Sequence, residues 1–178
     1  MKSFLLLIVV ITNVFCQDSE KLVVYGNMGI GLSQGGFQDH DGGTVARLGV
    51  SLSMYYLHIK IDRTINNEPS IFEPPEKITS YSGLIGVSTQ PFRNLPELFV
   101  VGKYGIGNGE KIKRGKIIFY RPFDDDYEII SEKYTTNILE LDLELRFQYF
   151  GMYLGGFFEF NRRFDIYGVT VGAIFGNF

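Results

Sequence analysis

Residues 137–150 of this 178-residue chain read NILELDLELRFQYF. From Leu139 to Tyr149 every second residue is apolar, and the positions between them are polar: Glu140, Asp142, Glu144, Arg146 and Gln148. Successive side chains of a β-strand point to opposite faces, so this pattern predicts one apolar face and one polar face. A helix would spread the leucines around its circumference, so the helical interpretation fails.

The same alternation recurs along the chain and predicts an all-β fold. It is present in residues 22–33, 44–54, 79–89, 97–107, 152–161 and 164–178, and more weakly in 112–121. With residues 137–150, these segments make eight expected strands. Turn signals separate several of them, at residues 35–36, 41–43, 90–91, 108–109 and 161–165, and two longer connections are expected at 63–76 and 122–134.

The alternation changes phase after Tyr55-Tyr56, where Leu57, Ile59 and Ile61 become the apolar positions. A strand that leaves a hydrocarbon layer through an aromatic belt would show this change, and so would a β-bulge. With the first strand rising from the periplasmic side, the long connection 63–76 then falls at the end of a membrane barrel where short turns are typical.

Composition limits the class of protein. The net charge is −3, whereas nucleic-acid-binding proteins are usually basic, so no nucleic-acid partner is expected. The single Cys excludes a disulfide framework or a multi-cysteine zinc site within the chain. Apolar residues make up 45% of the chain and aromatic residues 15%, which argues against intrinsic disorder.

Residues 1–16 have the order of a secretory signal peptide. Lys2 gives a positive start, residues 4–11 form an unbroken apolar run, and cleavage after Cys16 would release Gln17. The run is shorter than the roughly 20 residues that a membrane-spanning helix needs. Lipidation of Cys16 and retention of the segment are the alternatives. Cleavage leaves residues 17–178 as one barrel domain, with about 20 residues for each strand and its connection.

Alternation alone does not tell whether the apolar face meets a protein core or lipid. Most of the expected strands approach the 9–11 residues that a spanning strand needs, longer than average soluble strands. Aromatic residues also gather near strand ends, at 55–56, 119–120, 149–150 and 157–158, as girdles at two membrane interfaces would. The sequence therefore predicts an eight-stranded antiparallel up-and-down transmembrane β-barrel.

The last expected strand carries a resemblance. Val169, Val171, Ala173 and Phe175 lead to a terminal Phe178, and together with the leader segment and the alternating strands they resemble bacterial outer-membrane β-barrel proteins. The glycine-rich first strand and the Gln17 start are similar to small barrels of the Bacteroidetes type, with an OmpA/OmpX-like fold. In that family a C-terminal aromatic strand is read by the barrel-assembly machinery, which implies an assembly signal at Phe175 and Phe178. Phe178 departs from the family pattern, because it has the opposite parity to Phe175.

A barrel of eight strands has a lumen filled by side chains rather than an open pore. Polar-face residues would form that filling. Buried charges are tolerated when they are paired and hydrogen-bonded, so the sequence predicts a lumen charge network of both signs. Its expected members are Arg47, Lys103, Arg146, Glu140, Asp142, Glu144 and Glu159.

Motifs for chemistry are sparse. Asp39-His40-Asp41 and Asp124-Asp125-Asp126 have carboxylates that suit a metal ion, but neither has the spacing of a known site, so solvated loops are the simpler interpretation. His58 lies in no recognisable catalytic context. The carboxylate row at 140–144 fits an internal salt-bridge ladder better than acid–base catalysis. No catalytic residue, metal or cofactor is therefore assigned, and an enzyme is not the favoured interpretation.

The expected function is that of an integral outer-membrane, porin-like barrel with a structural, adhesive or interaction role through its loops. Expected partners are outer-membrane lipid and the assembly machinery. Two alternatives stay open: a soluble secreted or periplasmic barrel that binds an apolar ligand, and an outer-membrane lipid-modifying enzyme. The absence of Trp disfavours a lipocalin-type carrier. In a soluble barrel, Leu141, Leu143 and Leu145 would pack on other protein atoms.

Overall fold

The computed structural model describes residues 22–36, 42–68, 76–119 and 126–178. The expected signal peptide, residues 1–16, lies outside these ranges. The described chain forms eight strands: β1 (Leu22–Gln34), β2 (Gly42–Met54), β3 (Leu57–Asn67), β4 (Lys77–Thr89), β5 (Leu98–Phe119), β6 (Asp126–Arg146), β7 (Phe150–Phe160) and β8 (Asp165–Gly176). No helix within the described residues is long and apolar enough to cross a membrane.

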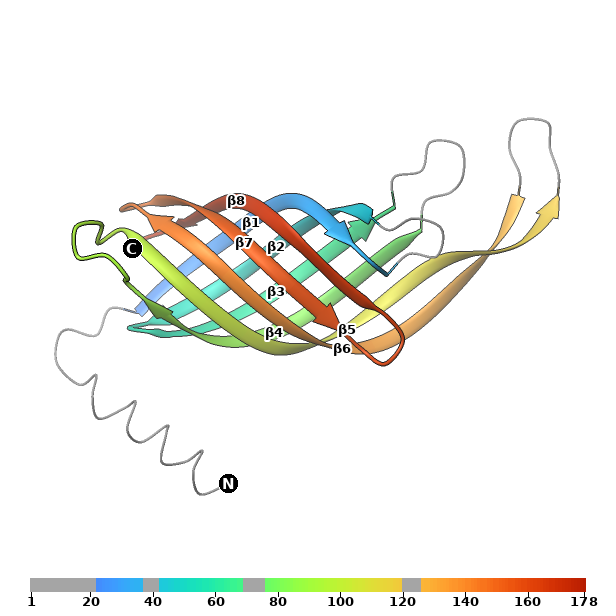
Figure 1. Ribbon diagram of the computed structural model, residues 1–178, viewed down its shortest axis with the longest axis horizontal. Coiled ribbons are helices and arrows are strands. Elements are labelled where there is room, and N and C mark those ends of the chain that lie inside the picture. The colour runs from blue at the N-terminus through green and yellow to red at the C-terminus, as the bar shows by residue number, and fades with distance from the viewer. Residues whose placement is uncertain (1–21, 37–41, 69–75, 120–125) are drawn as a thin grey trace, which may run out of the picture.

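Each strand pairs antiparallel with the next, and β1 also pairs with β8, so the sheet closes on itself (Figure 1). Met28 of β1, for example, lies between Leu48 of β2 and Ala173 of β8. Closure removes the unpaired edges that an open sheet would expose. The predicted eight-stranded antiparallel up-and-down barrel is confirmed.

The structure has the predicted number of strands, but it divides the chain into strands differently at two places. Residues 57–67 form a separate strand, because Tyr55 and Tyr56 make a two-residue turn with Tyr55 at a φ of 55°. A tight turn resets which residues face inward, so the phase change there is neither a bulge nor an exit from a hydrocarbon layer. The expected segments 97–107 and 112–121 are instead one strand, β5, and Asn108-Gly109 is paired with β4 and β6 rather than turning.

The connections differ between the two ends of the barrel (Figure 1). The turn end carries residues 55–56, 90–97 and 147–149, together with Phe178 and the start of β1. The opposite end, called the loop end, carries the last residues of β1, β3 and β7, the first residues of β2, β4 and β8, and the turn 161–164. The connection expected at 63–76 on the turn side is therefore wrong in bounds and side: residues 63–67 belong to β3, which ends at the loop end because this additional strand reverses the direction of the chain.

Strands β5 and β6 extend far beyond their neighbours. Pairing with β4 ends at Ile112, and pairing with β7 begins at Asn137. Beyond these points, within the part of the chain that the structure describes, the two strands pair only with each other, with register shifts between Arg114 and Phe119. The resulting two-stranded ribbon, residues 113–119 and 126–136, projects past the loop end and is called here the projecting hairpin (Figure 1).

Glycines give the narrow interior room for large polar side chains. Gly49 of β2 faces inward, and a Cβ atom there would lie 2.7 Å from side-chain oxygens of both Asn27 and Asp62. An added methyl group at this position would displace the side chain of Asn27 or Asp62. At the loop end, Gly35 and Gly36 each have a φ of 85°, a conformation that favours glycine where the chain leaves β1.

Candidate functional site

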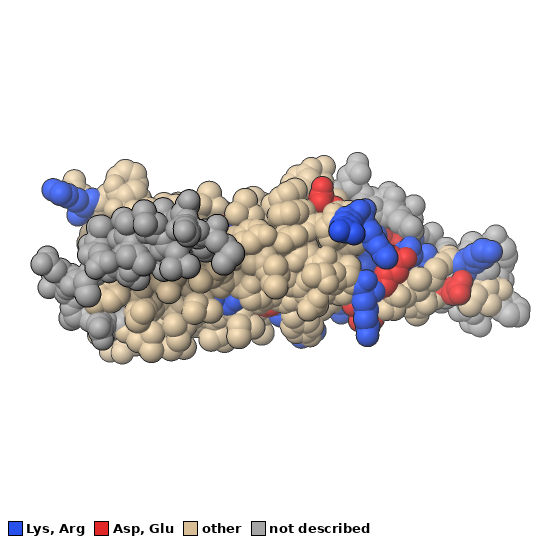
Figure 2. All heavy atoms as spheres, turned by 90° about the horizontal axis from the view of Figure 1, so that it is seen from below, with Lys and Arg blue, Asp and Glu red and all other residues tan. Residues whose placement is uncertain are grey.

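The outer surface of the barrel is apolar. Leu141 of β6, which the soluble alternative would bury, is 60% exposed, and Ile61 of β3 is 70% exposed. Leu139 and Leu143 are exposed as well, and Leu145 is half-buried. On the face seen in Figure 2, the middle of the barrel is mostly free of charged side chains, and most of the visible charges gather at the loop end. Monomeric proteins in water rarely expose so large a continuous apolar surface.

Exposed aromatic side chains occur toward both ends of this belt. At the turn end they include Tyr55, Tyr56, Phe92, Phe147, Tyr149, Phe150 and Phe175, and toward the loop end Tyr81, Tyr104, Phe158 and Tyr167. Tyr and Trp favour membrane–water interfaces because one part of the ring is apolar and another is polar. Two aromatic bands around an apolar belt are the arrangement found in barrels that cross a membrane.

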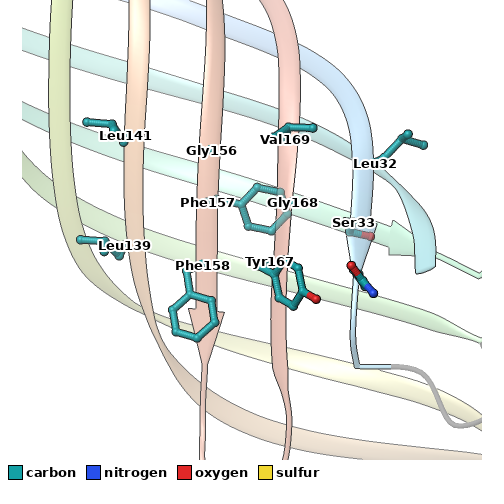
Figure 3. A pocket seen from close by; sticks show the side chains of 11 residues that line it. Leu32, Ser33, Leu139, Leu141, Gly156, Phe157, Phe158, Tyr167, Gly168 and Val169 are labelled. Atoms are coloured by element: carbon teal, nitrogen blue, oxygen red, sulfur yellow. The ribbon is translucent and has the colours of Figure 1, made fainter. Parts of the chain in front are cut away.

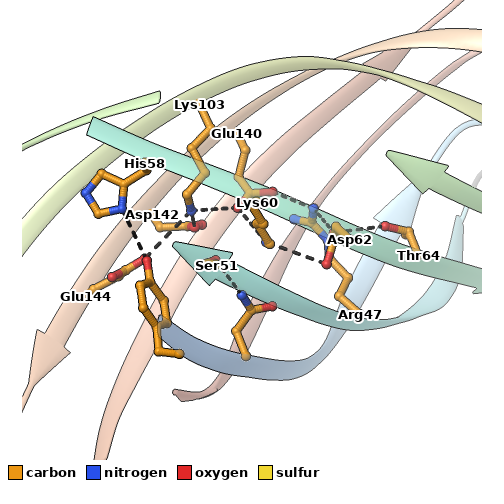
Figure 4. Close-up of polar contacts among 12 residues, drawn as sticks. Arg47, Ser51, His58, Lys60, Asp62, Thr64, Lys103, Glu140, Asp142 and Glu144 are labelled. Atoms are coloured by element: carbon orange, nitrogen blue, oxygen red, sulfur yellow. Dashed lines mark hydrogen bonds and ion pairs between the residues drawn. The ribbon is translucent and has the colours of Figure 1, made fainter. Parts of the chain in front are cut away.

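The middle of the barrel interior contains charged side chains rather than apolar ones. Eight of them form the central charge network, which has four cations and four anions: Arg47, Lys60, Lys103, Arg146, Asp62, Glu140, Asp142 and Glu144. Figure 4 shows all of them except Arg146. Their side chains are at most 6% exposed. Removing charges from water is costly, and it is tolerated here because opposite charges contact each other directly.

Glu140 lies at the middle of the network. Its carboxylate accepts hydrogen bonds from Lys60 Nζ at 2.8 Å and from Lys103 Nζ at 2.9 Å, and it also contacts the guanidinium of Arg47. Arg47 in turn donates from Nε to Asp62 at 2.8 Å. Strands β2, β3, β5 and β6 are therefore joined across the lumen as well as through the sheet (Figure 4).

A second part of the network lies nearer the turn end. Arg146 donates to Glu144 from Nε at 2.8 Å and from Nη2 at 2.6 Å, and it donates to the hydroxyl of Tyr25 at 3.3 Å. Nδ1 of the fully buried His58 lies 3.3 Å from the same hydroxyl. Lys103 contacts Asp142 and lies 3.7 Å from Glu144, so it connects the two parts.

Glu159, also expected in the lumen network, is buried but lies apart from the central charges. Its carboxylate accepts hydrogen bonds from Ser80 at 3.3 Å and from Tyr134 at 3.2 Å. No ion pair to Glu159 occurs within the described parts of the chain. The other six predicted lumen residues, Arg47, Lys103, Glu140, Asp142, Glu144 and Arg146, all lie in the central charge network.

Sequence reasoning missed Lys60 and Asp62, which β3 places inside the barrel. Their alternation with Leu57, Ile59 and Ile61 was visible, and a two-residue turn at 55–56 would have assigned them to the lumen. It also missed a charged cluster at the loop end. There Arg114 donates to Glu68 at 3.0 Å, and Lys111 lies 3.7 Å from Glu76.

Apolar layers flank the central charges. On the loop side Val45, Ile78, Tyr134, Phe157 and Ile166 pack together, and on the turn side Tyr25, Tyr153 and Ile174 do so. Phe178 packs on the second layer, with its ring centroid 5.4 Å from that of Tyr25 and 5.6 Å from the guanidinium of Arg146. Phe175, with the opposite parity, is on the outer surface. In the described part of the barrel, these layers and the central charge network fill the lumen with side chains.

Candidate chemical groups fall in three places. Asp39-His40-Asp41 and residues 124–125 lie outside the described residues. His58 is 0% exposed inside the barrel, where a substrate would not reach it. Among the described residues, no group of three or more His, Cys, Asp or Glu side chains could hold a metal ion.

Comparison with known proteins identifies the fold. No protein-family model and no curated protein sequence matches this chain. Among solved structures, Neisserial surface protein A matches with a TM-score of 0.62 and 8% identity over 89% of this chain and 99% of that chain. Ail, the attachment invasion locus protein of Yersinia pestis, matches with a TM-score of 0.55 and 12% identity over 85% of this chain and 97% of that chain.

A further structure of Ail, in complex with the heparin analogue sucrose octasulfate, matches with a TM-score of 0.51 and 14% identity. It covers 86% of this chain and 98% of the other. At such low identities the likeness shows a shared fold, the small eight-stranded barrel. The function of this chain must be argued from its own surfaces.

Proposed function

We propose that this chain is an integral bacterial outer-membrane protein that presents its loop end to the cell exterior. One observation carries the proposal: the side chains of the central charge network face inward and pair, while the apolar side chains around them face outward in a continuous belt. In water this arrangement would bury charge and expose hydrocarbon, both at a cost in free energy. In a bilayer the outer belt meets acyl chains, and the closed sheet leaves no backbone edge in the hydrocarbon.

The test is fractionation followed by an unboiled gel. The chain expressed in a Gram-negative bacterium should be recovered with outer membrane, and its band should shift in mobility between unheated and boiled samples. Recovery in aqueous buffer without detergent would overturn the proposal. Four expectations from the sequence are separate predictions. They are the signal peptide at 1–16, recognition of Phe175 and Phe178 by the assembly machinery, the porin-like character and the Bacteroidetes-type origin.

We further propose an adhesive or interaction role for the projecting hairpin. Among the described residues, no strand pairs with its outer edges, and free edges are templates on which a partner can add a strand. Ile118 is 62% exposed and Ile129 is 73% exposed, well outside the apolar belt. Exposed apolar side chains on a free edge support a protein-binding role, and Ail, one of the similar structures, is described as an attachment invasion protein.

The hairpin is tested by replacing both isoleucines. Cells displaying the variant Ile118→Ser/Ile129→Ser should lose attachment to protein-coated surfaces, while its gel shift stays normal. The control is Leu95→Ser, which removes a 49% exposed apolar side chain from the opposite end of the barrel. Unchanged attachment of the hairpin variant would contradict the interaction role without affecting the membrane assignment.

A further inference from the structure

Basic side chains gather on one side of the loop end, where β7 stops short of β6. Arg162 and Arg163 occupy the turn between β7 and β8, and Lys133 lies on the part of β6 that has passed beyond β7. With Thr135, Asn137, Phe160 and Asn161 they line a notch of about 560 Å³. This volume is in the range of small-ligand sites.

The turn holds the two arginines at the notch. Oδ1 of Asn161 accepts hydrogen bonds from the backbone N–H of Arg163 at 2.8 Å and of Phe164 at 3.2 Å. Asn161 Nδ2 is buried and has no hydrogen-bond partner among the described residues. An unpaired buried donor is costly, and an acceptor in the notch would relieve it.

The charges of the notch are mostly uncompensated. Within the described residues, neither Lys133 nor Arg162 makes an ion pair. Arg163 lies 3.5 Å from Glu132, but Lys113 contacts that carboxylate more closely, at 2.6 Å. Two more carboxylates lie nearby: Glu110 is opposite Lys133 on β5 and accepts a hydrogen bond from Ser131, and Asp165 begins β8. Neither of them lines the notch. The cluster therefore keeps an excess of positive charge and of donors, which suits an anion such as a phosphate.

Next to the notch, on the side toward the middle of the barrel, the outer face of β6, β7, β8 and β1 is hollowed. Leu139, Leu141, Phe158, Tyr167, Val169 and Leu32 surround a groove of about 540 Å³ over Gly156 and Gly168 (Figure 3). Phe158 and Phe160 join the groove to the notch, since their rings stack at 5.3 Å between centroids. A basic notch therefore continues into an apolar groove on the outer surface of the barrel.

We propose that this combined surface binds one anionic membrane lipid, with its phosphate headgroup in the notch and an acyl chain along the groove. A lipid fits better than a soluble polyanion because only a lipid uses both halves: the phosphate pairs with Lys133, Arg162 and Arg163, and the acyl chain fills the hollow over Gly156. The proposal rests on membrane insertion of the barrel, but not on what the projecting hairpin binds.

The test compares two triple variants with equal loss of charge. Lys133→Gln/Arg162→Gln/Arg163→Gln removes the notch cations, and Arg63→Gln/Lys77→Gln/Lys116→Gln removes three cations from β3, β4 and the tip of β5. Each protein is placed in nanodiscs of phosphatidylcholine, and titration with phosphatidic acid is followed by native mass spectrometry of the retained lipid. The notch variant should bind about tenfold more weakly or worse, equivalent to about 1.4 kcal/mol, while the control stays near the parent protein.

Further measurements distinguish a lipid phosphate from a soluble anion as the ligand of the notch. Inorganic phosphate and sucrose octasulfate are added as competitors, and both should displace little phosphatidic acid because neither fills the groove. Gly156→Leu should weaken retention of the lipid while all three cations remain. Equal losses in the two triple variants, or stronger binding of the sulfated sugar than of the lipid, would overturn the proposal. The gel shift of each sample reports insertion, so a failure of the barrel assignment is seen separately.

Discussion

Glu140 is the residue whose environment is most demanding. Three cations, Arg47, Lys60 and Lys103, contact its carboxylate in a lumen where it is 1% exposed. With Glu140 neutral, the network would hold four cations against three anions. Breaking a buried ion pair by removing one partner typically costs about 3–5 kcal/mol, because the remaining charge is left uncompensated.

We therefore expect Glu140→Gln to lower the free energy of unfolding by about 3–5 kcal/mol. The matched control is Glu159→Gln, which removes an equally buried carboxylate that accepts hydrogen bonds from Ser80 and Tyr134. Its cost should be about 1 kcal/mol, typical of one neutral hydrogen bond. Urea titrations in detergent, followed by the gel shift, measure both. Equal costs would show that the central charge network does not act as a unit.

At the scale of elements, the turn between β2 and β3 has an unusual backbone. Tyr55 has a φ of 55°, a left-handed conformation that costs roughly 1–2 kcal/mol in most residues and less in Asn. Tyr56 follows it with nearly the same exposure, 39% against 38%. The two positions therefore share the loss of aromatic surface on substitution and differ in backbone conformation.

Tyr55→Asn is thus expected to be more stable than Tyr56→Asn by about 1 kcal/mol, because Asn relieves strain only at position 55. Unfolding of the two variants in the same lipid vesicles gives the difference directly. If Tyr56→Asn were the more stable of the two, the aromatic contacts of Tyr55 would outweigh its backbone strain.

The base of the projecting hairpin carries a pH-sensitive contact outside the apolar belt. A hydrogen bond from Lys113, at 2.6 Å, lowers the pKa of Glu132 below its usual value of 4.5, and nearby Arg163 adds to the effect. A carboxylate with a lowered pKa in the folded state contributes stability that is present above its unfolded pKa. This contribution is lost as the pH falls through the folded pKa.

The hairpin base is expected to loosen only when the pH falls below about 4.5. NMR titration of the Glu132 carboxyl carbon should give a midpoint below 4.5, and Lys113→Gln should move the midpoint upward. The variant Lys116→Gln serves as the control, since it removes an exposed cation from the same strand. An unchanged midpoint in Lys113→Gln would show that the contact is absent in solution.

At the scale of the whole molecule, one charged substitution on the outer surface tests whether the apolar belt faces lipid or water. Leu141 lies in the middle of the outer belt, between Leu139 and Leu143. Arg on the lipid face of a membrane barrel costs about 2–4 kcal/mol at the bilayer midplane and about 0–1 near the interfaces. Leu141→Arg should therefore destabilise the folded protein in vesicles by about 2–4 kcal/mol.

The control for this prediction is Thr135→Arg, which places the same side chain on the outer face of the same strand beyond the belt. Its cost should be close to zero. A negligible cost for Leu141→Arg would mean that the belt faces water, and the membrane assignment would then be wrong.

Local alternation was sufficient to predict the kind of fold. Leu139 to Leu145 point one way and Glu140 to Arg146 the other because a strand reverses its side chains at each residue, whatever surrounds it. The same rule did not predict where the chain turns from one strand into the next. Asn108-Gly109 is a common turn pair, yet continuous pairing with β4 and β6 holds it inside a strand. Lys60 and Asp62 were missed because one two-residue turn inverts the assignment of every later position in the segment.

The alternation of apolar and polar residues thus determined the strands, their apolar outer face and the polar side chains of their inner face, since these features depend on near neighbours in the chain. Which charges meet depended on closure of the sheet: Arg47 and Glu140 are 93 positions apart, and register and strand tilt bring them together. The notch at Arg162 and Arg163 has the same origin, because it exists only where β6 outruns β7. Contacts across a barrel require strand order, register and strand length together, and alternation along one strand contains none of the three.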